Sequence, residues 1–290
     1  MRLKPKLILT NLSLALMLVI SPIAQSKLLS QPATNARQLA ANRYDSSNDI
    51  FHPVYGKNGM VASEQGLATQ VGLDILKQGG NAIDAAVAVG FALAVVLPNA
   101  GNIGGGGFMV LHDDKTGKDV AIDFREIAPA KASRDMYLDN QGNVIDGKSL
   151  FTHDASGVPG TVAGMEYALK KWGTMPLSKV LEPAIKLADK GFIVSDVLAQ
   201  TLKEEKSTLG KWSSSKAIFF KNGEPLKSGD LLVQKDLAKS LRLIAKQGAK
   251  AFYQGEIATK IAKEMQSQGG TMTLEDLKAY KVVERQPIIG

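Results

Sequence analysis

The sequence contains no cysteine and only three histidines among its 290 residues. The absence of cysteine excludes disulfide bonds, thiolate metal sites and a cysteine nucleophile. It also suits an oxidising compartment, where an unpaired thiol would be a liability. The histidines, His52, His112 and His153, are too dispersed for an HExxH motif or a comparable metal-binding pattern. We therefore expect surface or loop histidines and no metal site.

Other signals of familiar chemistry are also missing. The sequence has no Gly-x-Ser-x-Gly motif, so nothing in it supports a serine triad. Aromatic residues make up only 6%, and the lysines and arginines are scattered among aspartates and glutamates. A nucleic-acid partner is not expected, because such proteins gather their basic residues into a patch or stripe. We also expect no cofactor.

The N-terminal segment differs in composition from the rest of the chain. Three basic residues precede an apolar run over residues 7–20, and small residues follow at 24–26, where a signal peptidase would cut. The run is short for a membrane span of about 20 residues and is interrupted by polar residues. We therefore predict a cleavable signal peptide over 1–26, a periplasmic location and no stable membrane anchor. The polar stretch 27–53 is predicted to be a flexible leader, and the folded domain is expected over 54–290.

Residues 101–129 are the most informative stretch of the chain. They place a run of four glycines, a hairpin and one arginine in close succession. Gly104, Gly105, Gly106 and Gly107 remove every Cβ where the backbone turns, so a ligand or another strand can approach the main chain. A phosphate cradle is not favoured, because the dinucleotide motif needs a strand before its glycines and a helix after them, and here the order is reversed.

The hairpin after the glycines ends in a candidate anion-binding residue. Residues 113–118 are predicted to be its turn, between two apolar runs. Alternation then puts Ile122 and Phe124 on one face of the second strand, and Asp123 and Arg125 on the other. We expect a buried strand with Arg125 at its end. A planar, permanently charged guanidinium on a rigid element can hold a carboxylate through two parallel hydrogen bonds.

Simpler interpretations of these charged residues remain open. Arg125 could be a strand-end arginine that only pairs with Asp123 or Glu126. The two carboxylates could act as a general acid and base, since neighbouring carboxylates can have separated pKa values. We favour supporting roles: Asp123 shares a face with Arg125 and would help to hold its guanidinium, whereas Glu126 would point to the opposite side. In the glycine-rich turn 157–164, Thr161 is expected to cap the following helix and not to act as a nucleophile.

The remaining pattern is mainly helical and predicts an α+β domain with a helix-rich second half. Helical spacing with plausible ends is found over 63–77, 82–97, 164–171, 181–190, 195–206, 235–246 and 256–266. Asn81 can cap the second of these helices, which is apolar all round and therefore expected in the core. Thr273 and Asp276 make a capping box for a last helix that ends near Tyr280. Residues 135–148 are predicted to be a loop, and 211–230 a loop or hairpin.

Several long motifs in one order resemble the γ-glutamyltranspeptidases, also called glutathione hydrolases. The resemblance runs from about residue 54 to the last residue and is greatest with periplasmic bacterial members. The motifs lie at residues 59–63, 79–86, 104–107, 123–126 and 157–164.

The resemblance implies a specific fold and two subunits with different roles. Members of this family are N-terminal nucleophile hydrolases with a four-layer αββα sandwich, in which strands from two subunits share two stacked sheets. A precursor, or zymogen, cleaves itself before a threonine, and that threonine becomes the nucleophile of the small subunit. It lies beyond the region matched here, so no catalytic residue is expected in this chain, which resembles the front part of the large subunit. With strands missing from each sheet, we expect an uncovered sheet face.

The resemblance also implies a role for Arg125 and a set of partners. In the family, the arginine of this motif binds the α-carboxylate of the γ-glutamyl group. The implied partners are a small subunit that carries the threonine nucleophile, glutathione and other γ-glutamyl compounds, and amino-acid or peptide acceptors. Two alternatives remain: a cephalosporin (glutaryl) acylase of the same fold, and a truncated, non-catalytic polypeptide that binds glutathione or another subunit.

Overall fold

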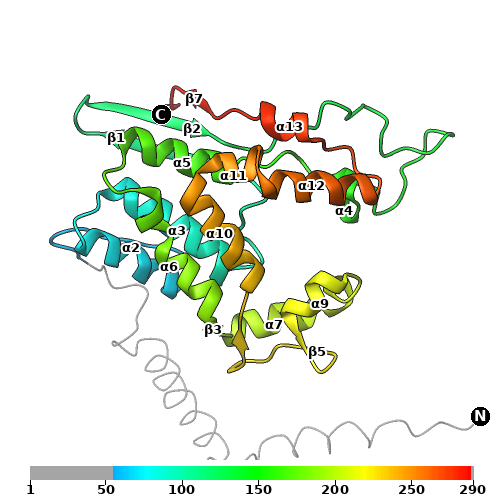
Figure 1. Ribbon diagram of the computed structural model, residues 1–290, viewed down its shortest axis with the longest axis horizontal. Helices are drawn as coiled ribbons and strands as arrows, with labels where there is room; N and C mark the ends of the chain where they lie inside the picture. Colours follow the sequence, from blue (N-terminus) through cyan, green and yellow to red (C-terminus); the bar gives the residue numbers. More distant parts are fainter. Residues whose placement is uncertain (1–54, 289–290) are drawn as a thin grey trace, which may run out of the picture. The chain divides into compact units, whose positions relative to one another are not determined.

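Two consecutive helices begin the described part of the chain, which is residues 55–288 of a computed structural model (Figure 1). Helix α2 spans Gly66–Lys77 and α3 spans Ala82–Val96, which confirms both predicted helices. The Asn81 side chain accepts hydrogen bonds from the backbone N–H groups of Ile83 and Asp84, as expected for its cap. The predicted signal peptide, the predicted leader and the first residue of the predicted domain lie outside the described residues.

Helix α3 is the centre of the helical layer. It packs against α2, α5 (Thr161–Trp172) and α6 (Leu177–Lys190), and α10 (Lys235–Gln247) packs on α6. Its side chains are buried on nearly every side, as the apolar sequence of α3 predicts. Gln234, just before α10, donates a buried hydrogen bond of 2.8 Å to the carbonyl of Val95. The end of α3 is therefore tied to a helix that follows about 140 residues later in the chain.

The other predicted helices are also present, with shifted ends. Helix α7 spans Asp196–Glu204, α12 spans Glu256–Ser267 and α13 spans Leu274–Ala279, whose capping box between Thr273 and Asp276 is confirmed. The interval 211–230 is a hairpin only in part, because it also contains a helix. The shorter elements are α4 (Lys148–Phe151), η1 (His153–Ala155), α8 (Lys206–Leu209), α9 (Ser213–Phe219), α11 (Ala249–Tyr253), β3 (Phe192–Ile193), β4 (Phe220–Lys221), β5 (Glu224–Pro225) and β6 (Leu231–Leu232).

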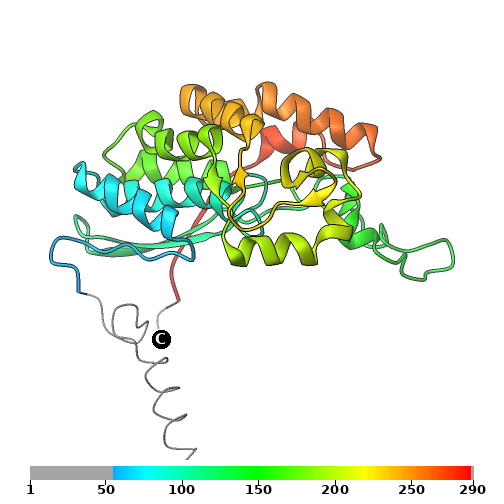
Figure 2. The same cartoon turned by 90° about the horizontal axis from the view of Figure 1, so that it is seen from below.

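The main sheet has three antiparallel strands in the order β1-β2-β7. Strand β1 spans Phe108–Asp113, β2 spans Lys118–Asp123 and β7 spans Val283–Arg285. The register pairs Phe108 with Asp123, and Ala121 with both Val110 and Arg285, so all five share one face. Figure 2 shows α2, α3 and α5 on one side of β1 and β2.

The prediction of a buried strand was wrong for one of the two sheet faces. Ile122 is fully buried towards the helices, but Phe108 and Val110 on the opposite face are 63% and 70% exposed. The described helices cover only the face of β2 that carries Ile122, and the face that carries Asp123 and Arg125 stays open among residues 55–288. Among residues 55–288, the expected uncovered sheet face is therefore present, and it is apolar at β1.

Asp84 is a buried charged residue that joins two helix ends. Its carboxylate accepts hydrogen bonds from the N–H of Asn81 at 2.8 Å, from the N–H groups of Thr174 and Met175 at 2.9 and 3.0 Å, and from the Thr174 hydroxyl at 2.6 Å. Burial by itself would raise the pKa of Asp84, but these four hydrogen bonds together outweigh it and lower the pKa. The start of α3 is thus fixed to the loop between α5 and α6.

Among residues 55–288, no helix is long and apolar enough to cross a membrane. Helix α3 is strongly apolar but contains only 15 residues. This length suits a core helix, because a helical span needs about 20 residues.

Replacing Asp84 by alanine should destabilise the protein by about 3 kcal/mol, because a helix cap is lost and buried donors at residues 174 and 175 are left unpaired. The free energy of unfolding in urea, followed by the fluorescence of Trp172, measures this. Since the pKa of Asp84 is lowered in the folded state, its stabilisation is present above the ordinary value of 3.8 and is lost as the pH falls through the folded-state value. The difference in the free energy of unfolding between Asp84→Ala and the parent should therefore become smaller at acidic pH.

The matched control is Asp236→Ala, which removes a first-turn aspartate that is 88% exposed at its side chain. This change should leave the unfolding midpoint unaltered. Equal stability of Asp84→Ala and the parent at neutral pH would contradict the role assigned to Asp84.

Candidate functional site

The glycine loop is connected to two other segments by backbone hydrogen bonds. The carbonyl oxygen of Gly105 accepts from the N–H groups of Gly160 at 2.7 Å and Thr161 at 3.0 Å. Gly107 and Phe124 exchange a pair of hydrogen bonds, which extends the β1–β2 ladder by one step. The loop between α3 and β1, the end of β2 and the start of α5 therefore meet at one place, although they are far apart in sequence.

At three of the four glycines a Cβ would meet a neighbouring atom closely, and at Gly106 that atom belongs to the backbone. A Cβ on Gly105 would lie 2.6 Å from the Asn102 side chain, one on Gly106 would lie 2.6 Å from the carbonyl oxygen of Phe124, and one on Gly107 would lie 3.0 Å from the Phe124 ring. At Gly104 a Cβ would meet no atom within 4 Å. The run therefore serves close packing at three positions and leaves open space at the fourth.

Thr161 does not cap the helix that follows it, so that prediction was wrong. Helix α5 begins at Thr161 itself, and Gly160 precedes it without a side-chain cap. The Thr161 hydroxyl instead donates to the Asn102 side-chain oxygen at 3.1 Å, and the same oxygen accepts from the N–H of Gly105 at 2.6 Å. The hydroxyl is thus used to fix the glycine loop, a long-range contact that helix-capping rules do not detect.

Arg125 lies just after β2, with its main chain held on both sides. Its N–H donates to Oδ1 of Asp123 at 3.0 Å, and its carbonyl oxygen accepts from the hydroxyl of Tyr280 at 2.8 Å. The residue is exposed, and within residues 55–288 its guanidinium takes part in no ion pair. The end of the strand is therefore fixed, while the charged group at its tip is available to another molecule.

Asp123 is paired with a different arginine from the one expected. Its Oδ2 accepts a hydrogen bond of 2.8 Å from Nε of Arg285 in β7, and its Oδ1 binds the main chain of Arg125, not the guanidinium. The hydrogen bond from the Arg125 N–H and that from Arg285 hold the pKa of Asp123 below its ordinary value. Asp123 is therefore an ionised structural group, which fits the predicted supporting role better than proton transfer.

Glu126 lies beside the glycine loop. A Cβ on Gly106 would come within 2.8 Å of its carboxylate oxygen, and one on Gly157 within 2.9 Å of its Cβ. Neighbouring Ile127 forms a bridge with Val158, with backbone hydrogen bonds of 3.2 and 2.8 Å. The residues after Arg125 are thus packed between the two glycine-rich turns.

Tyr280 is a residue of this site that sequence reasoning missed. Its ring stacks on that of Tyr253, with 5.6 Å between centroids and 15° between planes. Burial and the nearby charges of Asp123 and Glu126 raise the pKa of Tyr280 to about 12, so its hydroxyl remains a donor at neutral pH. The only signal in the sequence was a tyrosine at the end of a short helix, and nothing local connects that position to Arg125.

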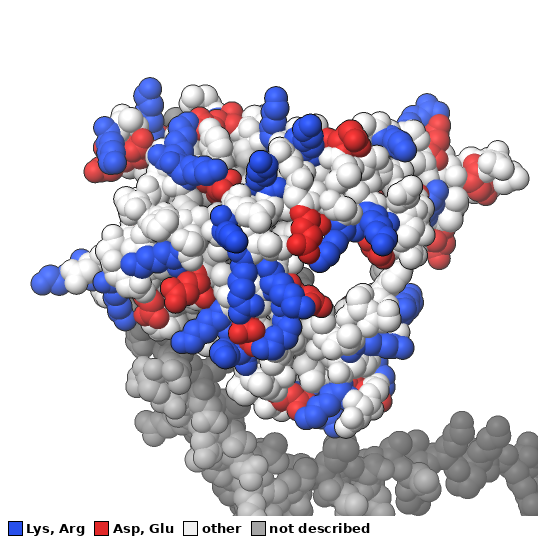
Figure 3. All heavy atoms as spheres, viewed as in Figure 1, with Lys and Arg blue, Asp and Glu red and all other residues white. Residues whose placement is uncertain are grey.

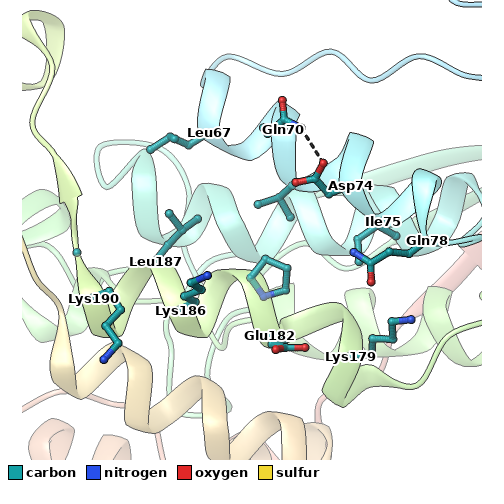
Figure 4. A pocket seen from close by; sticks show the side chains of 13 residues that line it. Leu67, Gln70, Asp74, Ile75, Gln78, Lys179, Glu182, Lys186, Leu187 and Lys190 are labelled. Atoms are coloured by element: carbon teal, nitrogen blue, oxygen red, sulfur yellow. Dashed lines mark hydrogen bonds between the residues drawn. The ribbon is translucent and has the colours of Figure 1, made fainter.

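Two grooves formed by the described residues are not lined by Arg125. One of about 540 Å³ runs between α2 and α6, where Leu67 and Leu187 lie among charged residues and Gln70 donates to Asp74 at 2.7 Å (Figure 4). Another, of about 790 Å³, is bordered by the turn of the β1–β2 hairpin, Trp172 and residues 284–287. Neither is lined by Arg125, which is exposed within residues 55–288.

The described residues contain no group of three or more acidic or histidine side chains that could hold a metal ion. His112 pairs with Asp119 at 2.8 Å on the exposed hairpin, and this hydrogen bond raises the pKa of His112. Acidic side chains lie among the lysines and arginines on the face shown in Figure 3. The absence of a nucleic-acid partner and of a cofactor stays a prediction.

Comparison with known proteins relates this arrangement to one family. The family model for gamma-glutamyltranspeptidase matches residues 68–290. The glutathione hydrolase proenzyme of Escherichia coli (strain K12) is 62% identical over 248 residues, which are 85% of this chain and 43% of that protein. The chain therefore spans less than half the length of this relative.

Solved structures show the same fold. The Helicobacter pylori gamma-glutamyltranspeptidase aligns with a TM-score of 0.80 and 53% identity over 82% of this chain and 68% of that one. A cephalosporin acylase from Bacillus halodurans aligns with a TM-score of 0.73 and 31% identity over 84% of this chain and 47% of that one. These similarities confirm the predicted α+β class as part of an N-terminal nucleophile hydrolase fold.

A matched pair of substitutions tests the packing of the glycine run. Gly106→Ala should lower the free energy of unfolding by about 1–3 kcal/mol, because its Cβ would overlap the carbonyl of Phe124. Gly104→Ala makes the same chemical change in open space and should leave the urea midpoint unaltered. Equal urea midpoints for Gly106→Ala and Gly104→Ala would show that close approach of the backbone does not explain the run of glycines.

Proposed function

This chain belongs to the gamma-glutamyltranspeptidase family, and from that premise we propose that it is the front part of the large subunit of a γ-glutamyltransferase or glutathione hydrolase. Its Arg125 binds the α-carboxylate of the γ-glutamyl group of glutathione and related compounds. Asp123, Glu126 and Gly104–Gly107 support that anchor. The threonine nucleophile lies outside this chain, which by itself would be inactive.

The proposal rests on one observation: the main chain of Arg125 is held by hydrogen bonds on both sides, whereas its guanidinium forms no ion pair among residues 55–288. Both main-chain polar groups are bound by side chains, and Asp123, two residues earlier on the same face of the strand, is already paired with Arg285. A guanidinium that extends from a fixed main chain and has no counter-ion among residues 55–288 suits an anionic ligand. A carboxylate can meet its planar fork with two hydrogen bonds, which also fixes the orientation of the substrate.

By binding one end of the substrate, Arg125 aligns the scissile carbonyl with the nucleophile. In the family reaction, a threonine hydroxyl attacks the γ-amide carbonyl, and its own α-amine takes up the hydroxyl proton. The C–N bond of the amide breaks, the leaving amine takes that proton, and an acyl-enzyme remains, which water or an acceptor amine then resolves. Arg125 fixes the opposite end of the γ-glutamyl group, so that the scissile carbonyl sits in register with the nucleophile. Acceptors are amino acids or peptides, and no metal or other cofactor takes part.

The open face of the β1-β2-β7 sheet supports a partner segment. Phe108 and Val110 are exposed there, and Phe108 is paired in register with Asp123, two residues before Arg125. We assign the covering partner to the small subunit that carries the threonine, released from the same zymogen by self-cleavage, as the word proenzyme in the name of the relative suggests. We also propose a periplasmic location and a signal peptide over residues 1–26 that is cleaved.

A cephalosporin acylase is the second candidate, because the Bacillus halodurans enzyme shares the fold. Its 31% identity is half of the 62% found for the glutathione hydrolase proenzyme, so the hydrolase is favoured. A glutaryl amide keeps the distal carboxylate and lacks the α-amine. Faster hydrolysis of a glutaryl amide than of a γ-glutamyl anilide by the complete enzyme would favour the acylase.

Arg125→Ala in the complete enzyme should reduce kcat/KM for a γ-glutamyl anilide by about 10- to 150-fold. This range corresponds to a lost charged hydrogen-bonding contact of about 1.5–3 kcal/mol. Self-cleavage should be retained, because it does not use the bound substrate. Arg125→Lys should recover only part of the loss, since an ammonium group lacks the planar fork. Steady-state kinetics and gel analysis of the two subunits measure these effects.

The control for Arg125→Ala is Arg134→Ala, which removes an arginine that is 90% exposed and paired only with the adjacent Asp135. It should leave kcat/KM unchanged. A second control is 4-aminobutyryl anilide, which keeps the amine of the substrate and lacks the carboxylate, so Arg125→Ala should hardly affect its hydrolysis. An unaltered kcat/KM for the γ-glutamyl anilide in Arg125→Ala would remove the assignment.

A further inference from the structure

The segment 273–285 returns to the neighbourhood of Arg125 and binds it at three points. Asp276 in α13 accepts from the N–H of Ala130 at 2.8 Å, the Tyr280 hydroxyl donates to the carbonyl of Arg125, and Arg285 binds Asp123. These contacts join residues about 150 positions apart in the chain. The contacted residues lie before, at and after Arg125. The segment 273–285 therefore fixes the path of the main chain on both sides of Arg125.

Tyr280 is the contact at Arg125 itself, and its own position is fixed. Its ring stacks on Tyr253, whose hydroxyl donates to the carbonyl of Pro159 at 2.8 Å and accepts from the N–H of Ala163 at 3.2 Å. Tyr253 is buried, whereas Tyr280 is half-buried. The stack therefore fixes the hydroxyl of Tyr280 relative to the start of α5 and to the glycine turn at 157–160.

The neighbouring glycine turn lies close to this hydroxyl. A Cβ on Gly160 would lie 2.1 Å from the Tyr280 hydroxyl oxygen and 1.9 Å from the carbonyl oxygen of Phe124. The hydroxyl thus lies between the glycine turn and the end of β2. A donor held in this way constrains the peptide group that follows Arg125, and with it the direction in which the guanidinium leaves the strand.

We propose that Tyr280 is a positioning residue for substrate binding, which acts through Arg125 by holding its carbonyl oxygen so that the guanidinium meets the α-carboxylate of a γ-glutamyl substrate. This inference rests on the proposed function. Tyr280 does not touch the substrate. Its hydroxyl sets the geometry of the bidentate contact, and a small misplacement of such a contact reduces the rate severalfold or more.

The test is Tyr280→Phe in the complete enzyme, which keeps the ring stack on Tyr253 and removes only the hydroxyl. KM for a γ-glutamyl anilide should rise and kcat/KM should fall by about tenfold, as for the loss of one hydrogen bond, with a smaller change in kcat. Hydrolysis of 4-aminobutyryl anilide, which lacks the α-carboxylate, should be unchanged. An equal loss on both substrates would indicate a general structural defect and overturn the inference.

The matched control is Tyr137→Phe, because the hydroxyl of Tyr137 also donates to a backbone carbonyl, that of Asp154 at 3.0 Å. This contact does not involve the Arg125 region, so kcat/KM should stay at the wild-type value. The unfolding midpoints of the two phenylalanine variants should be similar. A comparable loss of activity in Tyr137→Phe would overturn the inference, since any lost tyrosine hydrogen bond would then suffice.

A double-mutant cycle separates this inference from the proposed function. In an Arg125→Ala background, Tyr280→Phe should cause no further loss of kcat/KM, because the group that it positions is gone. A further tenfold loss in that background would overturn the role through Arg125. An impaired Arg125→Ala enzyme together with a wild-type Tyr280→Phe enzyme would overturn the inference alone. A fully active Arg125→Ala enzyme would overturn the proposed function and the inference with it.

Discussion

The main chain of Arg125 is bound on both sides, by the carboxylate of Asp123 at its N–H and by the hydroxyl of Tyr280 at its carbonyl. The proposed role of this chain depends on that constraint, because an arginine with many rotatable bonds can align a substrate only if its starting point is fixed. Asp123 also binds Arg285, so one carboxylate connects the anchor to β7. The charge of Asp123 is thereby used within the protein, and the guanidinium of Arg125 has no ion pair among residues 55–288.

The rest of the fold supports this constraint through close backbone packing. The glycine turns at 104–107 and 157–160 allow the carbonyls of Gly105 and Phe124 to approach neighbouring segments at distances that a Cβ would prevent. Behind them, the helical layer around α3 covers one face of the sheet and holds Asp84 in a network of four hydrogen bonds. The exposed Phe108 and Val110 mark the opposite face as the side where ligand and partner segment would meet.

Local features of the fold were predictable, because periodicity and capping are encoded within a few residues. The cap at Asn81, the box at Thr273 and the alternation around Ile122 are of this kind. The contacts that define the candidate site are not, because Tyr280 reaches Arg125 across 155 positions and no sequence period records such a pairing. Thr161 failed as a cap for the same reason, since its hydroxyl has a distant partner. Local sequence marked Arg125 as a candidate anion-binding residue, whereas its proposed ligand came only from the family resemblance.

The most direct measurement is a crystal structure of the complete enzyme with bound L-glutamate. We expect the α-carboxylate oxygens to lie about 2.7–3.0 Å from two nitrogens of the Arg125 guanidinium, with the Tyr280 hydroxyl still bonded to the Arg125 carbonyl. A glutamate whose α-carboxylate binds another cation, with Arg125 turned into solvent, would contradict the assignment.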